Sequence, residues 1–261
     1  MVTTGPAARD RLALALDVDD LDSAVVLARR LRPWFAVAKV GLELFSAAGP
    51  SAIARLADEG FAVFADLKLY DIPTTVGRAA RVLGRAGARY LTVHLSGGAA
   101  VVGAAVSGLR EGVAVSSRGE EPAGGADGAA VLGVTVLTSD PDAAPDRVAA
   151  LAAMAASTGC GGVVCAGSDL EVIGRVAPGL RRVVPGIRPA GGATDDQARV
   201  VTPGGAVAAG ADLLVVGRAV TAASDVEAAA AAVHDEVERS LNAVGLSRPG
   251  TVWSAGAGPS G

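Results

Sequence analysis

Short apolar runs with the character of β-strands recur along the chain and alternate with longer stretches of helical periodicity. Eight such runs can be counted, and they span residues 12–18, 36–40, 62–67, 90–94, 131–137, 162–165, 182–184 and 213–216. Runs this short and this apolar are typical of parallel strands that are buried on both faces. Eight strand–helix units close a barrel, so the pattern predicts an α/β fold, a single (β/α)8 TIM barrel.

The stretches between these runs are rich in alanine and carry apolar residues at helical spacing, as in 21–31, 53–59, 76–86, 148–156 and 170–176. Glycines fall where a helix must end before the next strand, at Gly60, Gly87, Gly159, Gly179 and in the group Gly49-Pro50-Ser51. A last helix is expected over 225–241, with Ser224 and Asp225 as caps.

The domain organisation follows from the same pattern. Residues 12–244 are predicted to form one barrel, preceded by an N-terminal extension at 1–11. A stretch rich in Gly, Ala and Glu around 118–130 indicates a flexible insertion before the fifth strand, and 245–261 indicates a disordered C-terminal tail.

Charge and composition narrow the possible partners and the cellular setting. A net charge of -4 and a pI near 5.2 provide no general attraction to nucleic acid or to a membrane surface, so any anionic ligand must be held locally. Cys160 and Cys165 fit neither a disulfide scaffold nor a metal half-site. No signal peptide or membrane span is visible, and we expect a cytoplasmic protein.

Polar residues stand at the carboxyl ends of most predicted strands, the edge at which such barrels build their active sites. They are Asp17, Lys39, Asp66, Lys68, His94, Thr138, Ser139, Arg188 and Arg218. His94 has no second His or Cys nearby to form a metal site, so a packing and hydrogen-bonding role is preferred for it. This placement predicts a catalytic or binding site at that edge.

Asp66 and Lys68 interrupt an otherwise apolar strand. Residues two apart on a strand point to one face, and unpartnered charges inside a barrel would be costly, so the two are expected to pair. Lys39 and Asp71 are the expected further members of a neutral, highly polar tetrad. The alternative is a buried salt-bridge cluster that only fixes the register of the barrel.

A second group of residues has the composition of a phosphate site. It comprises Pro185-Gly186-Ile187-Arg188, the glycine-containing loop 191–197 and Gly217-Arg218. Barrels often bind phosphate in the loops after strands seven and eight, where glycine amides and an arginine meet the anion. The loop also has the composition of a lid over that phosphate. An ordinary solvent-exposed loop is the alternative.

With these residues in view, the chain resembles the bacterial orotidine 5'-monophosphate decarboxylases from Leu12 to about Ser224. The blocks that carry the resemblance are 16–18, 38–41, 64–76, 92–94, 137–139, 185–188, 196–199 and 216–218. The resemblance implies decarboxylation of orotidine 5'-monophosphate to uridine 5'-monophosphate and CO2, the last step of de novo UMP synthesis, with no cofactor and no metal.

The resemblance also implies a role for each matching residue. Lys68 would donate the proton and Asp66 would lie beside the departing carboxylate, while Asp17 and Lys39 would hold ribose hydroxyls. Asp71 and Thr75 would reach into the neighbouring subunit's site, so that the active unit would be a homodimer. Thr138 and Ser139 match positions near the pyrimidine, and the phosphate grip would comprise Arg188, Gln197, Gly217 and Arg218.

Two alternatives remain open at this point. A magnesium-dependent 3-keto-L-gulonate 6-phosphate decarboxylase or hexulose phosphate synthase resembles this family and shares Asp-x-Lys-x-x-Asp. Those enzymes carry a Glu at the end of strand two, where this chain has Lys39, and a cation there opposes a divalent ion. The other alternative is a non-catalytic barrel that binds a sugar phosphate.

Overall fold

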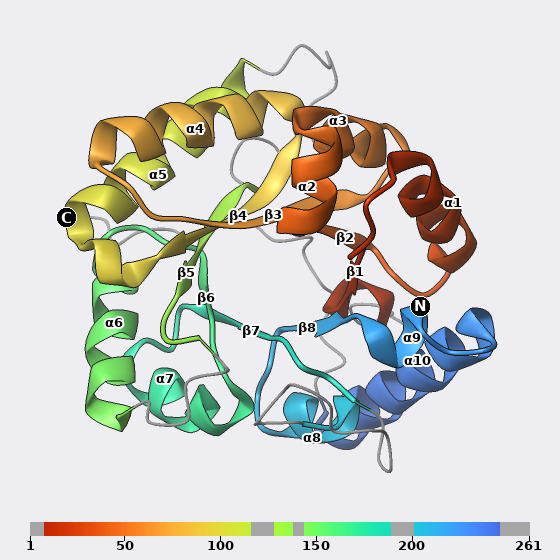
Figure 1. The fold of residues 1–261 in the computed structure, drawn as a ribbon. Helices are drawn as coiled ribbons and strands as arrows, with labels where there is room; N and C mark the ends of the chain where they lie inside the picture. Colours follow the sequence, from red (N-terminus) through yellow and green to blue (C-terminus); the bar gives the residue numbers. More distant parts are fainter. Residues whose placement is uncertain (1–7, 116–127, 138–143, 189–200, 246–261) are drawn as a thin grey trace, which may run out of the picture.

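Eight parallel strands form a closed barrel in the computed structural model, which describes residues 8–115, 128–137, 144–188 and 201–245. Each strand pairs with the next one along the chain, and β8 pairs with β1 to close the sheet. Figure 1 shows the colours running once around the barrel with the helices outside it. The strands are β1 Leu12–Ala15, β2 Val37–Val40, β3 Ala62–Leu69, β4 Ala88–His94, β5 Ala130–Val134, β6 Gly162–Val164, β7 Arg181–Val184 and β8 Leu213–Val216.

Helices connect and cover the strands, as the alternating pattern predicted. The 3-10 helices are η1 Ala8–Arg11, η2 Leu95–Gly97 and η4 Gly167–Asp169. The α-helices are α1 Leu21–Leu31, α2 Leu42–Ala48, α3 Pro50–Asp58, α4 Pro73–Ala86, α5 Ala99–Ala114, α6 Pro145–Ser157, α7 Leu170–Val176, α8 Pro203–Ala208, α9 Arg218–Thr221 and α10 Val226–Ala243. None of the helices within the described ranges combines the length and the hydropathy that a membrane crossing requires.

Two apolar layers hold the barrel together. One fills its inside and is built mainly from small and branched side chains, with Phe64 and Tyr90 in an edge-to-face contact at 6.3 Å between ring centroids. The other lies between the sheet and the helices. Alternate strand residues serve the two layers, which explains why the strands read as continuous apolar runs.

Several boundaries differ from those predicted. β1 ends at Ala15 and β5 at Val134, so Asp17 and 135–137 lie in the loops that follow these strands. Gly49 does not precede a strand; it joins α2 to α3, because Pro50 at the first position of α3 starts a new helix. Asp225, not Ser224, caps α10, since its carboxylate accepts the backbone N–H groups of Glu227 and Ala228.

The structure describes only part of the segments that were expected to lie outside the barrel. Residues 8–11 of the expected N-terminal extension form η1, which contacts α10 and β8. The start of the chain to residue 7, residues 118–127 of the expected insertion and the expected tail from 246 onward lie outside the described residues.

Candidate active site

The carboxyl end of β3 departs from a regular strand. Ala65 pairs with Leu91, but the next pair is Leu69 with Val93, so β3 carries two more residues than β4 over this interval. Within the bulge, Lys68 has φ 49°, and it is the only non-glycine residue with positive φ in the described part of the chain. A left-handed conformation costs an L-residue roughly 1–2 kcal/mol, and such strain is concentrated at functional sites. Strand alternation alone did not predict this bulge.

Four charged groups alternate in sign at this end of the barrel. Lys68 Nζ lies 2.9 Å from both carboxylate oxygens of Asp66. Asp66 Oδ2 lies 3.8 Å from Lys39 Nζ, and Lys39 Nζ lies 3.1 Å from Asp17 Oδ1. The charges alternate in sign along the row Asp17, Lys39, Asp66, Lys68, so each has an opposite charge as neighbour. The four charges sum to zero.

Burial differs along this row of charges. The two inner side chains, Lys39 and Asp66, are only 10% and 15% exposed, whereas Lys68 is 32% and Asp17 is 53% exposed. An inner charge left without a partner would cost several kcal/mol, which holds the row in place. The more open ends are the groups that a bound molecule can reach.

Asp71 lies apart from this row. Its side chain is exposed, and its carboxylate accepts the backbone N–H of Ile72 at 2.6 Å. Within its own chain Asp71 does not join the row, in which Asp17 is the second carboxylate, and the expected tetrad of Lys39, Asp66, Lys68 and Asp71 stays a prediction. Thr75, on the first turn of α4, is exposed as well. The exposure of Asp71 and Thr75 is compatible with the role expected for them at the neighbouring subunit's site. That role stays a prediction.

The row of charges lines a cavity of about 580 Å³, large enough for a small-molecule ligand. Its further polar or glycine lining comes from the loops and helices that follow β2, β7 and β8, and comprises Glu43, Gly186, Arg188, Gly217, Arg218 and Thr221. Arg188 is 8% exposed and donates to the Ile187 carbonyl at 3.2 Å. The structure thus brings the predicted phosphate residues Arg188, Gly217 and Arg218 to the same cavity as Lys68. Thr138, Ser139 and Gln197 lie outside the described residues.

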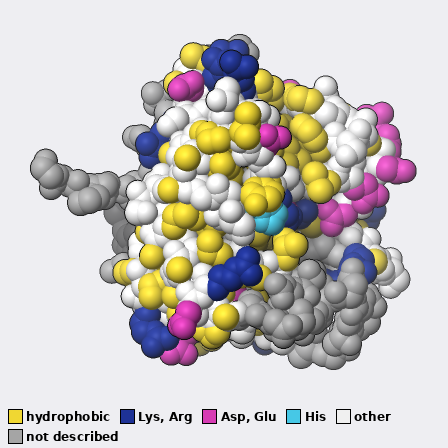
Figure 2. Space-filling model, turned by 60° about the vertical axis from the view of Figure 1, so that its left-hand side comes forward, with side chains coloured by type: hydrophobic (Ala, Val, Ile, Leu, Met, Phe, Trp, Pro, Cys, Tyr) yellow, Lys and Arg dark blue, Asp and Glu magenta, His cyan; other side chains and the backbone are white. Residues whose placement is uncertain are grey.

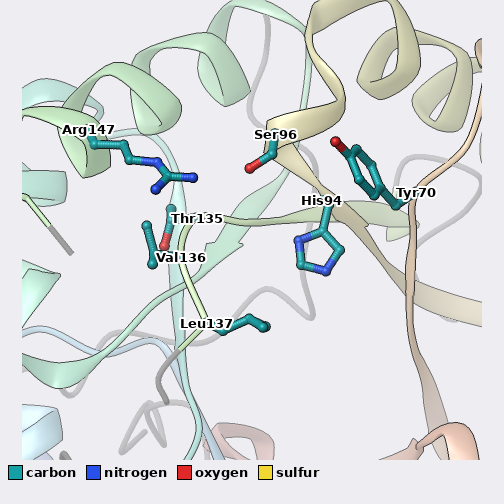
Figure 3. A pocket seen from close by; sticks show the side chains of 7 residues that line it. All are labelled: Tyr70, His94, Ser96, Thr135, Val136, Leu137 and Arg147. Atoms are coloured by element: carbon teal, nitrogen blue, oxygen red, sulfur yellow. The ribbon is translucent and has the colours of Figure 1, made fainter. Parts of the chain in front are cut away.

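A second cavity of about 400 Å³ shares Val136 and Leu137 with the first. Figure 3 shows the His94 and Tyr70 rings close together at one side of it, with Arg147 reaching in from α6. The ring centroids of Tyr70 and His94 lie 5.7 Å apart, a packing contact that agrees with the role preferred for His94. Burial lowers the pKa of His94, and the positive charge of Lys68 lowers it further.

The comparisons with known proteins decide the family. The model of the "Orotidine 5'-phosphate decarboxylase / HUMPS family" matches residues 10–233. The chain belongs to this family. Orotidine 5'-phosphate decarboxylase of Nitratidesulfovibrio vulgaris (strain DP4) is 47% identical over 239 residues, covering 87% of this chain and 97% of the relative. That of Moorella thermoacetica is 42% identical and covers 88% of this chain and 93% of the relative.

Solved structures agree with the family's fold. The crystal structure of orotidine 5'-phosphate decarboxylase from Lactobacillus acidophilus matches with a TM-score of 0.71 and 32% identity, over 87% of this chain and 98% of that one. The enzyme of the same name from Pyrococcus horikoshii OT3 matches with a TM-score of 0.67 and 28% identity, over 87% of this chain and 99% of that one. The predicted (β/α)8 barrel and the predicted family are both confirmed.

The charges of this family member leave little room for a metal ion in the cavity. Lys39 Nζ lies between the carboxylates of Asp17 and Asp66, the position in which a divalent cation would bridge them. Among the described residues, the one trio spaced to hold an ion is His234, Asp235 and Glu238. All three lie on α10 and none lines the cavity.

The scarcity of lysine in the sequence supports a specific role for Lys39 and Lys68 in the cavity. The sequence has 21 arginines, and its only two lysines are Lys39 and Lys68. Arginine supplies a positive charge equally well, but its guanidinium does not give up a proton at physiological pH, whereas an ammonium can. The only side chains that offer such an amine are therefore both in this cavity.

One residue of the site, Thr92, was not predicted from the sequence to have a role there. Thr92 on β4 is fully buried, and its hydroxyl donates to Asp66 Oδ1 at 3.0 Å. It also accepts the backbone N–H of Lys68 at 2.8 Å. A signal was present in the sequence, because Thr92 alternates with Tyr90 and His94 on the predicted strand and so shares a face with His94.

Proposed function

We propose that this chain decarboxylates orotidine 5'-monophosphate to uridine 5'-monophosphate and CO2 without a cofactor. The observation that carries the proposal is the row Asp17, Lys39, Asp66, Lys68 in one cavity with Arg188 and Arg218. An acid pair alternating with two ammonium groups suits a reaction in which a carboxylate leaves and a carbanion appears. The names of its relatives support the same activity.

Lys68 is the proposed proton donor. When the bond from C6 to the carboxylate breaks, the electron pair stays on C6 and CO2 departs. The Lys68 ammonium stabilises the developing negative charge and then gives C6 a proton, which leaves a neutral amine that solvent reprotonates. Lys68 is the more exposed of the two ammonium groups and is held by Asp66 on one side, so it can approach a ligand from the other.

Asp66 is placed to act on the carboxylate that leaves. Its two oxygens already accept from Lys68, and a substrate carboxylate beside them would add a like charge that CO2 loss removes. Asp17 and Lys39 form the adjacent ion pair and are proposed to hold the ribose hydroxyls, with Asp17 the exposed acceptor. The row thus orients the substrate as well as the reacting carbon.

The phosphate is proposed to lie at the ends of β7 and β8. Arg188 and Arg218 supply guanidinium groups there, and the chain at Gly217 allows a close approach of backbone amides. Gln197 belongs to the same proposed grip, and Thr138 and Ser139 are proposed to contact the pyrimidine. Phosphate binding remote from C6 provides energy that positions the ring against Lys68.

A homodimer with shared sites is part of the proposal. Asp71 and Thr75 are exposed and lie beside Tyr70 and Ile72 in the sequence, two residues that are 64% and 65% exposed. Figure 2 brings forward the side of α4, α5 and α6, over much of which hydrophobic side chains are spread. Apolar side chains exposed beside two polar ones are what a partner surface needs. A second copy would place Asp71 and Thr75 at its neighbour's cavity.

The chain's charge and its cysteines bear on its other partners and its setting. The substrate is the small anionic nucleotide, and the acidic chain gives no reason to expect nucleic acid or a membrane as a partner. Cys160 and Cys165 are buried, free thiols, which suits a cytoplasmic setting.

A direct assay tests the activity and separates it from its rival. Purified protein is mixed with orotidine 5'-monophosphate in EDTA, and the absorbance change to uridine 5'-monophosphate is followed. The proposal predicts turnover that EDTA does not alter. Absence of turnover, or turnover that a chelator abolishes and magnesium restores, would overturn it and favour the metal-dependent members of the family or a non-catalytic barrel.

A further inference from the structure

The hydroxyl of Thr92 joins the two residues on which the proposed chemistry depends. It accepts the Lys68 backbone N–H at 2.8 Å and donates its single proton to Asp66 Oδ1 at 3.0 Å. Thr92 itself is 0% exposed, and both of its bonds reach residues that are partly buried. A threonine hydroxyl has one proton, so its donor capacity is fully committed to Asp66.

The bulge in β3 explains why such a link is needed. Between the pairs Ala65–Leu91 and Leu69–Val93, β3 has three residues where β4 has only Thr92. The Lys68 N–H therefore finds its acceptor in the Thr92 side chain, and Lys68 keeps a positive φ that its own side chain disfavours. A buried N–H left without an acceptor would favour a different path for this segment.

We propose that Thr92 is a positioning residue that holds the Lys68 backbone and the Asp66 carboxylate in one fixed relation. The inference rests on the proposed function for its kinetic consequences, but its structural part concerns the chain alone. Asp66 is fixed by Thr92 on one oxygen and by Lys68 on both. Loss of the hydroxyl would free the lysine backbone and one carboxylate oxygen together, and so displace the ammonium from the reacting carbon.

The kinetic test replaces Thr92 by valine, which keeps the shape and removes the hydroxyl. Thr92→Val is expected to lower kcat about 100-fold, the effect of a displacement near 1 Å at a reacting group. KM should change less than about threefold, because phosphate and ribose contacts lie elsewhere. Thr92→Ser restores the hydroxyl and should recover kcat to within about tenfold of the wild type.

Thr135 provides a matched control. It is another buried threonine, 1% exposed, and its hydroxyl donates to the Val164 carbonyl at 3.1 Å. Thr135→Val removes a buried hydroxyl of the same kind one strand away, but it touches neither Lys68 nor Asp66. It should lower the free energy of unfolding as Thr92→Val does and leave kcat near the wild-type value.

A structural readout distinguishes failure of this inference from failure of the proposed function. Because the chain has two lysines, ¹⁵N-lysine labelling gives two backbone amide signals, of which Lys39→Arg assigns one. Hydrogen exchange at the Lys68 amide should be at least about tenfold faster in Thr92→Val than in the wild type and Thr135→Val. Unchanged exchange, or a kcat that falls equally in both threonine variants, would overturn the positioning role. If exchange accelerates but neither the wild type nor any variant turns over orotidine 5'-monophosphate, the proposed function fails and the structural link stands.

Discussion

Gly41 lies so close to Lys39 that a methyl group on it would be 3.0 Å from Lys39 Nζ and 3.1 Å from Asp17 Oδ1. The backbone there has φ -86°, which any residue adopts, so the glycine is required by space and not by conformation. Absence of a side chain at the N-cap of α2 therefore lets the Lys39–Asp17 pair close over this position.

Gly41→Ala should impair the site and leave the fold intact. The added methyl pushes Lys39 Nζ and Asp17 Oδ1 apart, and kcat/KM for orotidine 5'-monophosphate should fall about tenfold or more because the ribose contacts are misplaced. Steady-state kinetics and a thermal melt measure the two effects. Gly103→Ala on α5 is the control, since nothing lies within 4 Å of its added methyl. That control should gain roughly 0.5–1 kcal/mol in unfolding free energy with unchanged kinetics; an equal activity loss in both would argue against a local effect.

His94 should make stability depend on pH. Burial and the charge of Lys68 lower its pKa in the folded chain, so protonation is easier in the unfolded chain. The contribution of the neutral His94 is therefore present above its unfolded pKa near 6.5 and is lost as pH falls below that value toward the folded pKa. Urea unfolding at pH 8 and pH 5.5 should show a smaller difference for His94→Gln than for the wild type.

His234→Gln, on α10, controls for the loss of a histidine as such. An unfolding free energy of His94→Gln that falls between the two pH values as steeply as that of the wild type would show that His94 does not carry this dependence.

Shared active sites make a separate prediction. Lys68→Ala and Asp71→Asn chains should each be inactive, but a hybrid dimer has one site with an intact Lys68 and an intact partner Asp71. Equal mixing makes half of the dimers hybrids, so about a quarter of the wild-type activity should return. The mixture is assayed after denaturation and refolding together, with exchange verified by differently tagged chains. No recovery despite proven exchange would contradict a site shared between subunits.

The periodicity of the sequence predicted the barrel because each strand is buried on both faces and each helix on one. The ends of the strands were harder to predict: 16–18 and 135–137 are apolar enough to continue β1 and β5, yet the chain leaves the sheet there to enter the loops. Apolar character reports burial, and residues in buried loops such as Leu16 and Val136 are buried too. The same reasoning missed α2, which Gly49 separates from α3.

Within the site, the pairing of Asp66 with Lys68 followed from the two-residue spacing and the cost of burying charge. The geometry behind it did not follow, because the bulge and the positive φ of Lys68 depend on how β3 meets β4. Asp17 joins the row for a similar reason: its proximity to Lys39 arises across two strands. Such relations come from tertiary contacts that no local spacing encodes.

Lys68 tests the central claim most directly, through the rate of uridine 5'-monophosphate formation by the wild type, Lys68→Ala and Lys68→Arg. Arginine keeps the positive charge but cannot release a proton at neutral pH, so it separates charge from proton donation. The account predicts rapid turnover by the wild type, a loss of several orders of magnitude in both variants, and retained binding of uridine 5'-monophosphate by Lys68→Ala. Near-normal turnover by either variant would show that another group donates the proton and would contradict the account.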